Sequence, residues 1–150
     1  MLAYQIIASS EDFIELQKLL KDMQKYEYTP SENLLLQEAI KISSTIQSND
    51  YQRFFKMLKN TNYMFACIML NFIERLRRQA IHEFTKSTIF HGQKINGQFI
   101  MNALMLPDKV DCFNCIRGYG FNPDEETCNF DPKMRTDADT WTVEIKKFKQ

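Results

Sequence analysis

Histidine is scarce in this sequence, with only His82 and His91 among 150 residues. Because histidine is the side chain whose ordinary pKa lies closest to neutral pH, few groups are available for proton transfer. The four glycines form no glycine-rich phosphate loop, and neither a serine nucleophile elbow nor an H-E-x-x-H zinc motif is present. These absences argue against an enzyme. We therefore expect no catalytic residue, no cofactor and no small-molecule substrate.

Long apolar runs are also lacking. No stretch is long enough to span a bilayer, and the opening residues MLAYQIIASSEDF have no basic segment of the kind that begins a signal peptide. We expect an intracellular, soluble protein without membrane contact. A chain of this length with 44% hydrophobic residues fits one compact domain, or one domain with a small appended module.

Four cysteines are present, namely Cys67, Cys112, Cys115 and Cys128. Cys112 and Cys115 have C-x-x-C spacing, which could be half of a zinc site, but Cys128 and the two histidines form no second pair. A redox enzyme is the alternative, although its C-x-x-C pair belongs at a helix N-terminus after a strand, and this pair follows Pro107 within an apolar helical pattern. We expect no metal site and buried free thiols.

The net charge of zero hides a gradient along the chain. Residues 51–105 carry eight basic residues against two acidic ones, whereas residues 1–50 carry four against eight and residues 106–150 seven against nine. The basic middle hints at an anionic partner or at complementary contacts between modules.

Two helices are expected before residue 50. Ser9 can cap the first, which has Asp12 near its positive end. Its apolar positions are Phe13, Leu16, Leu19, Leu20 and Met23. Thr29, Pro30 and Glu32 form a capping box that opens the second helix. That helix carries Leu35, Ala39, Ile42 and Ile46 on one face and stops near residues 48–50.

The segment YQRFFKML predicts a short third helix with Phe54 and Phe55 adjacent. Successive helical side chains point about 100° apart, so two neighbouring aromatic rings cannot both lie at the centre of one narrow buried stripe. An inner helix of an antiparallel hairpin stack contacts neighbours on both sides and would bury both rings. Because no sequence repeat is visible, an ordinary helical bundle remains the alternative.

A long helix is predicted over residues 63–86. Its apolar residues recur at spacings of four and three, as Phe65, Met69, Phe72, Leu76 and Ala80. Arg77 lies one turn from Ile73 and one turn from Ile81, on a face that should be partly buried, so we expect Arg77 to have a structural role.

Basic residues of the same region are the candidates for nucleic-acid contact. Arg75, Arg78 and Lys86 recur with His82 along the long helix, and the preceding helix adds Arg53, Lys56 and Lys59. We expect contacts with phosphates, independent of sequence and sensitive to salt. A simply solvated face is the alternative. The helix near residues 108–117 is a poorer candidate because acidic residues offset its two basic ones.

The pattern changes after residue 87. STIF reads as a strand, QKING as a loop, and two helices follow at about residues 96–104 and 108–117, the second with Val110, Phe113 and Ile116 inward. Gly120 is a natural left-handed cap with Phe121 as its hydrophobic contact. TCNF and TWTVEIKKF read as further strands. This order is that of a winged helix that begins with the end of the long helix.

The segments NDYQRFFKML, YMFACIMLNFIERLRRQAI, STIF and LPDKVDCFNCIRGYGF together resemble the Sac/GANP family, the PCI-like scaffold proteins of the transcription-coupled mRNA export complex. The resemblance runs from about Tyr4 to Phe130. It implies a mainly α fold, with a TPR/PCI-like antiparallel helical hairpin stack over residues 1–87 and a winged-helix module with short strands over residues 88–150. Family members usually have further helices upstream, so we expect either a truncated or a reduced member whose first helix has a bare face.

The resemblance also implies a non-enzymatic, TREX-type scaffold in the nucleus, at the nuclear pore. Its winged helix would pair with a PCI-domain partner, which a small acidic subunit braces, and the assembled surface would bind RNA or DNA. Small single-domain members with centrosome or spindle roles are similar too, which gives the centrosome or cytoplasm as an alternative location. A proteasome-lid-like PCI subunit is a third alternative.

Overall fold

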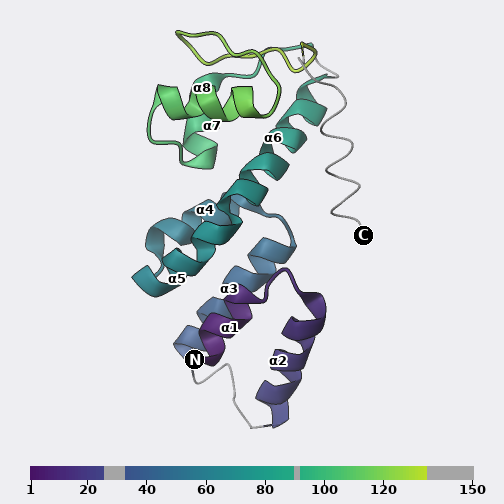
Figure 1. Ribbon diagram of the computed structural model, residues 1–150, viewed down its shortest axis with the longest axis vertical. Helices are drawn as coiled ribbons and strands as arrows, with labels where there is room; N and C mark the ends of the chain where they lie inside the picture. Colours follow the sequence, from purple (N-terminus) through teal and green to yellow (C-terminus); the bar gives the residue numbers. More distant parts are fainter. Residues whose placement is uncertain (26–32, 90–91, 135–150) are drawn as a thin grey trace. The chain divides into compact units, whose positions relative to one another are not determined.

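The structure is a computed structural model that describes residues 1–25, 33–89 and 92–134 (Figure 1). These residues are mainly helical, which confirms the predicted fold class at that level. The helical elements are α1 (Leu2–Ala8), α2 (Phe13–Lys25), α3 (Leu34–Gln47), α4 (Tyr51–Asn60), α5 (Tyr63–Met69), the 3-10 turn η2 (Leu70–Phe72), α6 (Ile73–Ile89), α7 (Gly97–Leu104) and α8 (Lys109–Gly118). None of the described helices combines the length and the apolar character needed to cross a membrane. The chain forms two compact units, Met1–Gln79 and Ala80–Gln150, which we describe separately.

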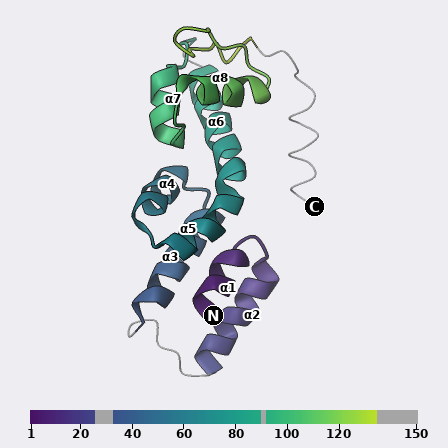
Figure 2. The ribbon, with the colours of Figure 1, turned by 60° about the vertical axis from the view of Figure 1, so that its left-hand side comes forward.

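Helix α1 packs against three other helices of the first unit. It contacts α2, α3 and α5, and it runs beside α2 in Figure 2. Its inward residues Ala3, Ile6 and Ile7 are buried. We predicted no helix here, and the reason is that α1 has only seven residues and no side-chain cap at its start. Short uncapped helices form through tertiary packing and leave little signal in the sequence.

The start of α2 corrects the predicted cap. Ser9 ends α1, and it is Asp12 whose carboxylate accepts hydrogen bonds from the main-chain N–H groups of Ile14 and Glu15. Asp12 therefore serves as the cap as well as the acidic residue near the positive helix end. Of the apolar positions predicted for this helix, Leu16 and Met23 are buried, whereas Phe13 is 64% exposed.

Helix α3 begins at a different cap from the one predicted. Asn33 accepts hydrogen bonds from the N–H groups of Leu35 and Leu36, and the predicted capping box at residues 29–32 lies outside the described residues. The core face contains Ala39, Ile42 and Ile46 as predicted, but it begins with Leu36, because Leu35 is half exposed. Either leucine fits helical spacing to Ala39, so the sequence alone could not choose between them.

The two adjacent aromatic residues of α4 are both buried, with 0% of Phe54 and 3% of Phe55 exposed, as the sequence predicted. Their rings meet edge to face with centroids 5.3 Å apart. The long helix predicted after α4 is divided into α5, η2 and α6, although its five predicted apolar residues are all buried.

In the second unit Ser87, Thr88 and Ile89 of the predicted STIF strand are helical, because α6 continues to Ile89. Phe90 lies outside the described residues. The Thr88 hydroxyl donates to the Phe84 carbonyl oxygen at 2.7 Å, and the Ser87 hydroxyl donates to the same oxygen at 3.0 Å. Hydroxyl side chains that bond back to the preceding turn fit within a helix, which explains why a β-branched segment is helical here. Helices α7 and α8 begin after caps at Asn96 and Asp108, close to their predicted starts.

Extended pairing in the described part of the second unit consists of one antiparallel bridge between Ile95 and Phe130. Phe130 belongs to the predicted TCNF strand, whereas Ile95 lies in a segment predicted as a loop. Residues 135–150, which include the predicted TWTVEIKKF strand, lie outside the described residues. Along the chain, the end of α6 is followed by a bridge residue, two helices and a second bridge residue. This order is compatible with a winged helix, which stays a prediction.

Helix α8 ends as the sequence predicted. Gly120 has φ +85°, a left-handed conformation that glycine adopts without penalty. Its N–H donates to the Arg117 carbonyl oxygen, and the Phe121 N–H donates to that of Ile116, which together form a Schellman motif. Phe121 is buried and stacks against Phe130 with ring centroids 5.0 Å apart.

Candidate functional site

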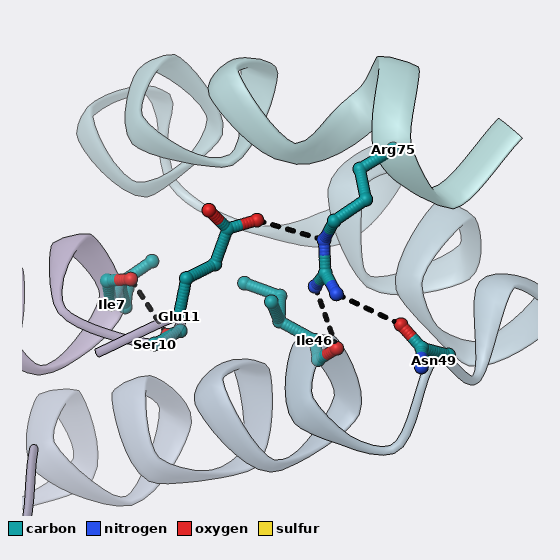
Figure 3. A network of polar contacts seen from close by, with 6 residues as sticks. All are labelled: Ile7, Ser10, Glu11, Ile46, Asn49 and Arg75. Atoms are coloured by element: carbon teal, nitrogen blue, oxygen red, sulfur yellow. Dashed lines mark hydrogen bonds and ion pairs between the residues drawn. The ribbon is translucent and has the colours of Figure 1, made fainter. Parts of the chain in front are cut away.

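Arg75, which the sequence suggested as part of an exposed basic row, lies within a network of polar contacts (Figure 3). Its Nη1 group donates to Asn49 Oδ1 at 3.0 Å, and its Nη2 group donates to the Ile46 carbonyl oxygen at 2.9 Å. Its Nε atom lies 2.7 Å from Glu11 Oε1. One guanidinium group therefore joins α6 to the end of α3 and to the turn between α1 and α2.

The network has a clear physical reason. The last carbonyl groups of a helix lack partners within the helix and carry partial negative charge. A guanidinium group at the end of α3 therefore supplies both a hydrogen-bond donor and a positive charge. Asn49, two residues after the end of α3, has φ +56°, a conformation that asparagine tolerates better than most residues. Ser10 supports the adjoining turn by donating to the Ile7 carbonyl oxygen at 2.6 Å. We therefore assign Arg75 a structural role and remove it from the candidates for phosphate binding.

The neighbouring arginines differ from Arg75. The Arg77 side chain is 18% exposed, lies 3.8 Å from Glu74, and places its guanidinium carbon 6.0 Å from the centroid of the Phe55 ring. This agrees with the partly buried position predicted for Arg77. Arg78 is half-buried, and Lys86 is exposed but belongs to the second unit. The predicted row thus contributes no group of exposed cations within the first unit.

A second basic area lies on the first unit, in a hollow of about 650 Å³ between α3 and α4. Three cations line it, Lys41 from α3 and Arg53 and Lys56 from α4, and all three are exposed. Arg53 and Lys56 were predicted candidates for phosphate contact. Lys41 was not among them, because its closeness to α4 depends on how the two helices pack.

Two of the four cysteines, Cys112 and Cys128, are buried and packed around Gly97. The prediction of buried thiols is wrong for Cys67, which is exposed, and Cys115 is half-buried. The Cys112 thiol donates to the Gly97 carbonyl oxygen at 3.7 Å, and a Cβ atom placed on Gly97 would lie 2.5 Å from Cys128 Cβ. Burial, with a smaller effect from the Cys128 thiol, raises the pKa of Cys112 to about 12. A catalytic dithiol needs a lowered pKa, so this environment disfavours the redox alternative. Among the residues the structure describes, no group of three metal-binding side chains comes together.

Two apolar side chains of the second unit, Val110 and Phe99, are exposed. Val110 of α8 was predicted to point inward, yet it is 65% exposed. Phe99 of α7 is 51% exposed and contacts Phe84 edge to face, with ring centroids 5.1 Å apart. Each follows helical apolar spacing, so periodicity alone could not separate them from core residues such as Ile100 and Ile116.

Comparison with models of protein families gives a match over most of the chain. The family model described as the SAC3/GANP family matches residues 1–125, a span that includes all the helices from α1 to α8. No curated protein matches the chain.

Proposed function

The chain belongs to the SAC3/GANP family, as the sequence resemblance indicated, and from this membership we propose that it is a non-enzymatic scaffold of an mRNA-export complex of the TREX type. The family match over residues 1–125 is the observation that carries the proposal. The buried, high-pKa thiol of Cys112 supports the non-enzymatic part, because it disfavours the redox chemistry that the C-x-x-C spacing suggested.

The proposed partner is a PCI-domain protein, braced by a small acidic subunit, that pairs with the C-terminal unit. The exposed side chains of Val110 and Phe99 support an interface on this unit, since large apolar side chains exposed on a helix are frequent at protein interfaces. They lie on α8 and α7, the helices that would be the third and second helices of a winged helix. We propose that the assembly acts in the nucleus, at the nuclear pore.

Affinity capture of the tagged full chain from nuclear extract, with the bound proteins identified by mass spectrometry, tests the proposal. We expect a PCI-domain export protein together with a small acidic subunit. Proteasome-lid subunits in their place would overturn the proposal, and centrosomal proteins would favour the role of the small single-domain members.

A matched pair of variants tests the surface. Val110→Asp places a charge on the proposed interface and should abolish capture of the PCI-domain protein. Ile14→Asp places the same charge on α2 of the first unit, where Ile14 is 80% exposed, and should leave capture unchanged. Equal capture by both variants would show that the partner binds elsewhere.

A further inference from the structure

We propose that the exposed face of α5 binds the same face of a second copy of this chain, and that the protein thereby forms a weak two-fold dimer. This α5 face consists of the exposed side chains of α5 and of the turn η2 that continues it, namely Tyr63, Met64, Cys67, Leu70 and Asn71. It lies within the first unit, and the proposal does not depend on the role in mRNA export.

The α5 face is apolar and exposed. Tyr63, Met64 and Leu70 are each more than half exposed, and Cys67 is exposed beside them. The opposite side of the same helix is already used in the core, where Phe65 is fully buried. Tyr63, Cys67 and Leu70 recur at spacings of four and three, the spacing of the seam between two paired helices. An exposed apolar surface of this kind is typical of a protein interface.

Two polar groups near the middle of the α5 face satisfy each other. A side-chain hydrogen bond with the Cys67 thiol raises the pKa of the Tyr63 hydroxyl. Burial of a polar group costs free energy mainly when the group loses its hydrogen bond. Because these two groups keep theirs, the face can be removed from water without leaving either of them unpaired.

The charges at the two ends of the α5 face favour a second copy of the chain as the partner. Lys59, which is exposed near the end of α4, precedes the face, and Glu74, which is 78% exposed at the start of α6, follows it. The Glu74 carboxylate lies 3.8 Å from Arg77, too far for a strong hydrogen bond. In a two-fold contact between antiparallel helices, each end of the face meets the opposite end of the other copy. Lys59 of each copy then lies near Glu74 of the other.

Cys67 lies at the middle of the α5 face, four residues after Tyr63 and four before Asn71. The two-fold axis of an antiparallel pair would therefore pass beside Cys67, and the two thiols would face each other. The same arrangement places Tyr63 opposite Asn71 of the other copy. It also places Met64 opposite Leu70, so apolar side chains meet on both sides of the axis.

The net charge and the size of the face determine the expected strength of the dimer. The chain has a net charge of zero, so two copies do not repel each other as whole molecules. Five side chains on one short helix bury less than the roughly 800 Å² per partner that is typical of stable complexes. We therefore expect a dimer that dissociates on dilution.

Sedimentation equilibrium of the full chain under reducing conditions, across a concentration series, tests the proposal. We expect the weight-average mass to rise from that of one chain towards that of two chains and no further. Leu70→Asp places a charge on the α5 face and should keep the chain monomeric. Leu34→Asp makes the same change at an 80% exposed leucine of α3 and should leave the dimer unchanged. A monomer at every concentration, growth beyond a dimer, or equal masses for the two variants would overturn the inference.

An exchange of charges tests the antiparallel arrangement. Lys59→Glu places two carboxylates opposite each other, and Glu74→Lys places two cations opposite each other, so each variant should dimerise less than the unmodified chain. The double variant K59E/E74K restores opposite charges and should recover the dimer. If the double variant dimerises as poorly as the single variants, the antiparallel arrangement is wrong.

Cross-linking with a short bis-maleimide tests the position of Cys67 at the two-fold axis. The unmodified chain should give a cross-linked dimer, and C67S should give none while still dimerising in sedimentation. C115S, which removes the half-buried thiol of the second unit, should cross-link as the unmodified chain does. Cross-linking that persists in C67S would place the contact elsewhere and overturn the proposal. Capture of the PCI-domain partner by Leu70→Asp should be normal, so self-association and the scaffold proposal can fail separately.

Discussion

The guanidinium group of Arg75 contacts the carbonyl oxygen of Ile46, 29 residues earlier in the chain, with Nη2 and the oxygen 2.9 Å apart. This contact caps the C-terminal end of α3 with a cation from α6. The same side chain bonds Asn49 and pairs with Glu11, so it ties together three segments of the first unit. The sequence suggested Arg75 as one of several exposed cations, whereas its contacts in the structure link segments of the first unit.

Replacement of Arg75 by alanine should destabilise the first unit by roughly 1–3 kcal/mol, the range for loss of charge-assisted hydrogen bonds at a partly exposed site. Its side chain is 34% exposed, so solvent can replace part of what is lost. Urea unfolding followed by circular dichroism measures the effect. Arg53→Ala is the matched control, because Arg53 is exposed, and its midpoint should stay close to that of the unmodified chain. Equal midpoints for the two variants would contradict the structural role of Arg75.

Truncation of either phenylalanine ring on α4 should lower the free energy of unfolding substantially. Phe54→Ala and Phe55→Ala each remove a buried ring and leave a cavity, which typically costs about 3–5 kcal/mol. Because the two rings touch, the double variant should cost less than the sum of the single variants. Phe13→Ala provides the same chemical change at a side chain that is 64% exposed, and its unfolding midpoint should hardly move. Exact additivity in the double variant would argue against the edge-to-face contact.

The sequence predicts well what depends on local spacing. The burial of the five apolar residues from Phe65 to Ala80 follows from helical periodicity, and the glycine cap at Gly120 follows from backbone conformation; the structure confirms both. These features involve residues within a few turns of one another. Propensity and periodicity act over that distance.

The sequence predicts poorly what depends on packing between segments. Arg75 and Glu11 are 64 residues apart, so no spacing rule connects them. The exposure of Val110, and the helical state of the β-branched residue Thr88, depend on neighbours that periodicity does not specify. The approach of Lys41 to the basic face of α4 is of the same kind, which is why the sequence indicated Arg53 and Lys56 but not Lys41.

Replacement of two glycines by alanine should change the stability of the second unit in opposite directions. On Gly97 a new Cβ atom would collide with the Thr127 carbonyl oxygen and lie 2.5 Å from Cys128 Cβ, so Gly97→Ala should destabilise the second unit by roughly 1–3 kcal/mol. On Gly118 a new Cβ atom meets nothing within 4 Å, and Gly118→Ala in a helix should stabilise by up to about 1 kcal/mol. Thermal melts by circular dichroism compare the two. A melting temperature for Gly97→Ala at or above that of the unmodified chain would show that Gly97 packs less tightly against Thr127 and Cys128 than described.

The thiol of Cys112 should make the stability of the second unit depend on alkaline pH. Burial raises its pKa from 9.0 to about 12, so between these values the folded chain keeps a proton that the unfolded chain has lost. The free energy of unfolding should therefore be fully retained below about pH 9 and should fall as the pH rises towards 12. Urea unfolding at several pH values between 8 and 11 measures the slope. Cys112→Ala lowers the overall stability by leaving a small cavity but should flatten the slope, whereas Cys67→Ala, at an exposed thiol, should retain it. An unchanged slope in Cys112→Ala would assign the alkaline loss of stability to other groups.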